Sequence, residues 1–127
     1  MEKLSSTQKG LVCQRQVTAF LRRYKFSVHE QQFHSPFDLL VNNKRIEVKA
    51  AGFDTTKKFW LFNIHRHNVL DETNVDIYIL RLENVPGFTY AIHLIIPAPL
   101  GVFNVQISLR SLLTRWGKYF NNIDALR

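Results

Sequence analysis

The chain has 127 residues, of which 46% are hydrophobic and 21% charged, and it carries a formal net charge of +7 at pH 7. These values predict a single folded domain over residues 1–127 with a substantial core, and they exclude disorder over most of the length. An excess of positive charge attracts polyanions, of which nucleic acid is the most common.

The single cysteine, Cys13, excludes an intramolecular disulfide and a cysteine-rich zinc site. Its neighbours are apolar, so we expect a buried and inert thiol. Residues 1–9 are polar, unlike a signal peptide, and the longest apolar run, at residues 91–99, contains His93 and prolines. We therefore expect a cytoplasmic protein that makes no contact with a membrane.

The first half of the chain predicts one helix followed by strands. Apolar residues recur at helical spacing over residues 7–24, after serines that can cap a helix. Residues 26–33 alternate between apolar and polar and predict a strand, which ends before Pro36. Two further strands, 37–41 and 45–51, flank the polar residues 42–44, which have the composition of a tight hairpin turn.

The second half predicts more strands and a closing helix. Strands are expected at residues 59–66, 75–82 and 89–96, the last after a turn at Pro86-Gly87. Ser108 is expected to cap a helix over residues 109–120. The order helix, about five strands, helix predicts an α/β sandwich with a mixed central β-sheet flanked by helices.

Residues 37–49 contain the pattern that points to chemistry. Side chains alternate along a strand, so Glu47 and Lys49 are expected to project together while Ile46 and Val48 enter the core. A tight turn would return Asp38 alongside them. A Glu-x-Lys pair alone is common on the solvent face of a strand, but an aspartate within Phe-Asp-Leu-Leu-Val costs several kcal/mol or so unless a partner or metal compensates it.

Two carboxylates and an ammonium suit the hydrolysis of a phosphodiester. Mg²⁺ prefers oxygen ligands and is often held by one or two carboxylates, with water and substrate phosphate completing its shell. Asp38 and Glu47 are the predicted ligands, the backbone carbonyl of Val48 is a third, and Mn²⁺ is expected to substitute. The metal would activate a water, which Lys49 would orient.

Asp38 followed by Glu47-Val48-Lys49 across a hairpin resembles the PD-(D/E)XK signature of restriction-endonuclease-like nucleases. Residues 9–15 also resemble the start of archaeal Holliday-junction resolvases, and the whole resemblance covers about residues 9–66. It implies a restriction-endonuclease-like sandwich and metal-dependent cleavage of DNA.

The sequence departs from that family at two positions. Phe37 separates Pro36 from Asp38, where the proline usually precedes the aspartate directly. Gln14 stands where the first helix of many relatives has a glutamate that helps hold the metal through water. Gln can accept a hydrogen bond from that water, but the loss of one negative charge predicts weaker metal binding.

Further residues are candidates for a supporting role. His65 and Arg66, at the end of a strand, would face the scissile phosphate, whereas Trp60, Phe62 and Ile64 are expected in the core. His65 and His67 have the spacing of a metal pair, but no third ligand is near in sequence and surface histidines explain them better. Contacts to nucleic acid are expected from Lys9, Arg15, Lys44, Lys57 and Lys58, with solvated loop charge as the alternative.

The sequence therefore predicts a Mg²⁺-dependent DNA endonuclease, either of homing or restriction type or similar to a Holliday-junction resolvase. The alternative is a nucleic-acid-binding module that kept the fold without the chemistry, and Gln14 is its best support. RNA is the less favoured substrate. Because cutting two strands needs two sites, a homodimer or a higher symmetric assembly is expected, with Trp116, Tyr119 and Phe120 as interface candidates.

Overall fold

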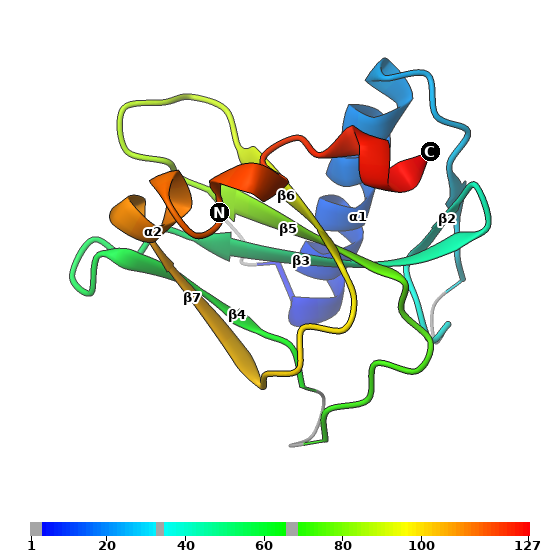
Figure 1. Ribbon diagram of the computed structural model, residues 1–127, viewed down its shortest axis with the longest axis horizontal. Helices are drawn as coiled ribbons and strands as arrows, with labels where there is room; N and C mark the ends of the chain where they lie inside the picture. Colours follow the sequence, from blue (N-terminus) through cyan, green and yellow to red (C-terminus); the bar gives the residue numbers. More distant parts are fainter. Residues whose placement is uncertain (1–3, 33–34, 66–68) are drawn as a thin grey trace.

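The computed structural model describes residues 4–32, 35–65 and 69–127 (Figure 1). Helix α1, Ser6–Arg23, confirms the predicted first helix. Ser5 begins it with a capping box, since its side chain accepts from the N–H of Gln8 while the Gln8 side chain accepts from the N–H of Ser5. Lys25, with φ of 70°, takes a left-handed conformation that turns the chain away after the helix.

Five strands form the central sheet in the spatial order β1-β2-β3-β5-β6. They are β1 (His29–Glu30), β2 (Leu39–Val41), β3 (Lys44–Gly52), β5 (Ile77–Glu83) and β6 (Ile92–Pro97). The β3–β5 pair is parallel and the other neighbours are antiparallel, so the predicted mixed sheet is confirmed. A parallel pair of strands needs a long crossover connection, and the connection between β3 and β5 is long enough to contain another strand.

That crossover contains β4 (Phe59–Asn63), which pairs with β7 (Asn104–Ser108) in a separate antiparallel sheet. The inward side chains of this small sheet, Trp60 and Phe62 among them, pack against Tyr78, Leu80 and Leu82 of β5. The other face of the central sheet packs against α1. The buried residues between them include Val17 and Leu21 of α1 and Leu39, Ile46, Ile77, Ile79 and Ile95 of the sheet. Burying one such aliphatic side chain contributes about 1.5–3 kcal/mol.

Two sequence predictions about elements are wrong, and one strand was missed. Of the strand predicted at 26–33, only His29–Glu30 is paired within the described residues, as a short edge strand. The strand β7 was not predicted at all. The predicted closing helix, 109–120, ends early: α2 covers Leu109–Leu113 and the 3₁₀ turns η1, Gly117–Tyr119, and η2, Ile123–Leu126, follow.

The helix ends early because its sequence changes after Leu113. Thr114 is β-branched and Gly117 is a poor helix former, so the segment gains little from a helical conformation. Trp116, only 7% exposed, packs into the core beside β4 and β7. Burial of the indole thus determines the path of the chain. Within the described ranges, no helix combines the length and apolar character that crossing a lipid bilayer requires.

Candidate functional site

The hairpin of β2 and β3 carries the predicted catalytic residues, and Figure 1 shows it at one end of the central sheet. Its turn residues Asn42 and Asn43 have φ of 50° and 63°, the left-handed pair that a two-residue hairpin requires and asparagine tolerates. The Asn42 amide donates to the Leu126 carbonyl at 2.7 Å, and the Lys44 ammonium to the Arg127 carbonyl at 2.9 Å. The turn is therefore tied to the C-terminal segment, and Lys44, a predicted DNA contact, is engaged there.

Asp38 lies against the segment of β3 that contains Glu47. Its N–H donates to the Ile46 carbonyl at 2.9 Å, and its carboxylate accepts the Val48 N–H at 2.8 Å. These two bonds involve the residues on either side of Glu47. Ile46 is also the register partner of Leu39, so two residues oppose one, as in a β-bulge that redirects a side chain.

The backbone of Val48 is directed toward Asp38. In a strand, the N–H and C=O of one residue point to the same neighbouring strand. Since the Val48 N–H bonds to Asp38, the Val48 carbonyl points to that same side, beyond the start of β2. Among the described residues, the second carboxylate oxygen of Asp38 receives no hydrogen bond. The Val48 carbonyl oxygen and this second Asp38 oxygen are both suitable ligands for a hard cation.

Glu47 and Lys49 project together from the opposite face of β3 to α1. The Lys49 ammonium is 3.7 Å from the Glu47 carboxylate, and the two side chains are 30% and 19% exposed respectively. The sequence prediction that they share a face is confirmed. An ammonium this close to a carboxylate can hold a water or a phosphate oxygen beside it.

Tyr78 is the neighbour of Glu47 on β5, and sequence reasoning missed it. Burial raises the pKa of Tyr78 well above its usual range, with further contributions from a hydrogen bond to Glu72 and the charge of Glu47. The Glu72 carboxylate also accepts the N–H groups of Leu100 and Gly101, at 2.7 and 3.0 Å. The Tyr78 phenol is therefore neutral. Through Glu72 it connects the neighbourhood of Glu47 to the loop before β7. Its apolar neighbours in sequence gave no signal of this position.

The donor set fits Mg²⁺ better than a softer metal. Two carboxylates and a backbone carbonyl are hard oxygen donors, and Mg²⁺ is typically held by few protein ligands plus water. Across the described ranges there is no group of three or more His, Cys, Asp or Glu side chains arranged to hold a metal.

Gln14 lies on α1 and donates to the Glu30 carboxylate of β1 at 3.4 Å. No described contact joins it to Asp38. Even so, the charge of Asp38 reaches α1: burial, with smaller contributions from the charges of Glu83 and Asp38, raises the pKa of Cys13 to about 12. Glu30, which the sequence prediction did not single out, places a carboxylate beside Gln14.

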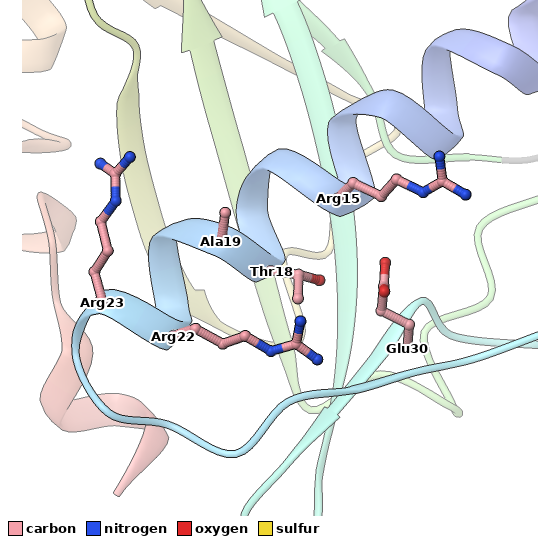
Figure 2. A pocket seen from close by; sticks show the side chains of 6 residues that line it. All are labelled: Arg15, Thr18, Ala19, Arg22, Arg23 and Glu30. Carbon is pink, nitrogen blue, oxygen red and sulfur yellow. The ribbon is translucent and has the colours of Figure 1, made fainter.

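Glu30 also lines a shallow pocket of about 500 Å³ between α1 and β1. Figure 2 shows the Arg22 guanidinium between Thr18 and Glu30, with Arg15 further along the helix and Arg23 directed away. Arg22 donates to the Val28 carbonyl at 3.2 Å. The predicted DNA contact Arg15 therefore lies on the α1 side of the molecule, beside an acidic side chain.

The other predicted residues belong to other segments of the chain. Lys57 and Lys58 are exposed in the turn before β4, and Lys9 is exposed near the start of α1. The His65 ring contacts Phe103, with a centroid separation of 5.4 Å. Arg66 and His67 lie outside the described residues.

Core and interface predictions have mixed outcomes. Trp60, Phe62 and Ile64 are buried, as predicted. Trp116 is wrong as an exposed interface candidate, because its indole is buried in the core. Tyr119 is half-buried, and Phe120 is 47% exposed.

A comparison with solved structures matches a bacterial homing endonuclease, I-Ssp6803I, with a TM-score of 0.62 and 14% sequence identity. The match covers 84% of this chain and 77% of that chain. At this identity the likeness is one of fold, and it supports the predicted α/β class. No family model matches the chain, and no curated protein matches it in sequence.

Proposed function

We propose that this protein is a Mg²⁺-dependent DNA endonuclease of the PD-(D/E)XK type. The observation that carries the proposal is the arrangement around Glu47: Asp38 bonds to the residues on both sides of it, and Lys49 is 3.7 Å from its carboxylate. The shared fold with a protein described as a homing endonuclease supports the same conclusion.

Each residue has a distinct task in the proposed hydrolysis. Asp38, fixed through one oxygen by the Val48 N–H, would offer its other oxygen to the metal, together with Glu47 and the Val48 carbonyl. When bound, Mg²⁺ supplies a Lewis acid that lowers the pKa of a coordinated water. Lys49 would orient the attacking water and neutralise charge on the phosphate. Water attacks phosphorus and releases a proton to solvent, the bond from phosphorus to the leaving oxygen breaks, and that oxygen takes up a proton from solvent.

The homing or restriction type is the preferred form of this proposal, because the fold comparison points to it. The resolvase-like form rests on residues 9–15 alone. Two-strand cleavage would need two copies of the site, so we propose a homodimer or a higher symmetric assembly with the exposed Phe120 at its interface. Light scattering of the wild type and Phe120→Asp tests this, and a wild type that is monomeric while cutting both strands contradicts it.

A cleavage assay tests the function. Purified protein is incubated with duplex, four-way and single-stranded DNA under Mg²⁺ and under Mn²⁺. We expect the wild type to cut, and Asp38→Ala, Glu47→Ala and Lys49→Ala each to lose at least about a hundredfold in rate, because a metal ligand or the water-orienting charge is gone. Asp124→Asn, an exposed carboxylate at the C-terminal turn, is the matched control and should retain the wild-type rate.

The outcomes separate the alternatives. Wild-type rates in the three variants would overturn the catalytic assignment. Binding of DNA without any cut strand under either metal would favour the non-catalytic module, for which the neutral Gln14 is the supporting observation. Circular dichroism of every variant checks that a lost activity does not reflect a lost fold.

A further inference from the structure

The outward face of the β4–β7 sheet has an unusual composition. Its inward residues are buried, as a two-layer core requires. Its outward residues form three cross-strand pairs: Leu61 with Gln106 and Asn63 with Asn104 are exposed, and Phe59 with Ser108 is half-buried. The solvent-exposed face of a sheet usually carries charged side chains, but neither of these strands contains a charged residue. The exposed residues of this outward face are three amides and one leucine instead.

The three amides have no partner within the described part of the chain. The side chains of Asn63, Asn104 and Gln106 make no hydrogen bond to any described residue. Each therefore presents one acceptor and two donors outward. The two strands hold the amides at a fixed spacing, since Trp60 and Ile107 on the opposite face of the same strands are completely buried.

This face matches the major groove of duplex DNA, which admits a two-stranded β-ribbon. Asn and Gln side chains bond to adenine through its N6 and N7 atoms, and apolar side chains contact the methyl group of thymine. We propose that Leu61, Asn63, Asn104 and Gln106 enter the major groove of the substrate and select A·T base pairs. The inference rests on the proposed function, because it assigns the base recognition of that nuclease.

Charge at one end of the sheet supports this occupant. Lys57 and Lys58 directly precede β4, and Arg110 closely follows β7. The pairing of Phe59 with Ser108 brings these three exposed cations to the same end of the ribbon. Cations beside a groove-binding element contact the phosphates and fix its register, while the amides provide the selectivity.

The β4–β7 sheet, the proposed DNA-binding ribbon, also lies on the side of the central sheet that carries Glu47 and Lys49. It covers the face of the central sheet from which Glu47 and Lys49 project, whereas α1 covers the opposite face. Its start is anchored at the end of β5 by the Trp60 indole, which donates to the Glu83 carbonyl at 2.8 Å. Figure 1 shows β4 running in the opposite direction to β3, the strand that carries Glu47 and Lys49, and the two strands are in contact.

The test is selection of duplexes from a randomised library by the full-length wild type, with Ca²⁺ in place of Mg²⁺ to favour binding. Asn104→Ala and Gln106→Ala should each weaken binding to the selected duplex by about 5- to 150-fold, the loss of one amide–adenine pair, and leave binding to random duplex unchanged. Gln16→Ala removes an exposed glutamine on α1 and should change neither. Because all three positions are exposed, thermal melting should show the same stability as the wild type.

A chemical probe identifies the contact directly. Replacing the selected adenines with 7-deazaadenine removes the N7 acceptor, so wild-type binding should weaken, while the matching alanine variant should lose nothing further. Unchanged base preference in Asn104→Ala and Gln106→Ala, with cleavage intact, would overturn the ribbon assignment and leave the proposed function standing. A wild type that selects A·T pairs in neither cleavage nor binding also overturns it, and one that binds no DNA at all overturns both proposals.

Discussion

His93 makes the stability of this fold depend on pH, in a direction that the structure determines. The imidazole is 7% exposed, and the ring of Phe20 from α1 stacks on it with a centroid separation of 4.0 Å. An N–H of the Arg81 guanidinium lies 3.0 Å from Nε2, so the neutral ring accepts a hydrogen bond there. Burial, together with the smaller effects of the Arg81 and Arg23 charges, lowers the pKa of His93 from its ordinary value of 6.5 to about 4.

The sign of the effect follows from proton binding. Between the folded pKa of about 4 and the unfolded value of 6.5, the unfolded chain binds a proton that the folded chain does not. The contribution of His93 to the free energy of unfolding is therefore complete at a pH above the unfolded pKa. It decreases as the pH falls from the unfolded pKa toward the folded pKa. Between about pH 7 and pH 5 the expected loss from this one group is about 2 kcal/mol.

Urea denaturation at a series of pH values measures this loss, with His93→Gln as the reference variant. Glutamine can still accept from Arg81 but does not titrate, so subtracting its stability removes the contributions of carboxylates common to both proteins. The wild type should lose about 2 kcal/mol relative to the variant between about pH 7 and pH 5. A difference that stays constant over this interval would refute the buried, neutral state of His93.

Two further predictions concern DNA binding without chemistry. Lys57→Ala with Lys58→Ala should reduce the slope of log affinity against log salt by up to about two phosphate contacts without changing which DNA is preferred, and titrations at several salt concentrations measure this. Glu47→Gln should bind DNA at least as tightly as the wild type in metal-free buffer, because it removes a repulsive charge. Weaker binding of this variant without metal would mean that Glu47 contacts DNA by another route.

The existence of the β2–β3 hairpin was predictable because its turn residues and its alternation are local. Asn42 and Asn43 specify the turn, and the alternation around Glu47 specifies which side chains share a face. The bulge at Asp38 could not be predicted, since it depends on which carbonyl accepts the Asp38 N–H. Buried strands such as β5 were found because their apolar runs are continuous.

The parts that sequence reasoning missed depend on contacts between distant segments. The strand β7 has only two buried residues, Val105 and Ile107, and it becomes a strand by pairing with β4, far earlier in the chain. The end of α2 depends on the burial of Trp116 in a core built by other elements. The pairing of Gln14 with Glu30 likewise joins a helix to an edge strand. No local pattern specifies any of these.

The two proposed carboxylate ligands differ in how firmly the fold holds them. Glu47 is in β3, which has paired strands on both sides, whereas Asp38 precedes the three-residue strand β2 and depends on a few hydrogen bonds to β3. Beyond β2 the sheet has only the two residues of β1. The bond from Asn42 to the Leu126 carbonyl compensates for this weak edge, because Leu126 is fully buried and clamps the hairpin turn to the core. The position of Asp38 relative to Glu47 is therefore set partly by the C-terminal turn, far from both residues in sequence.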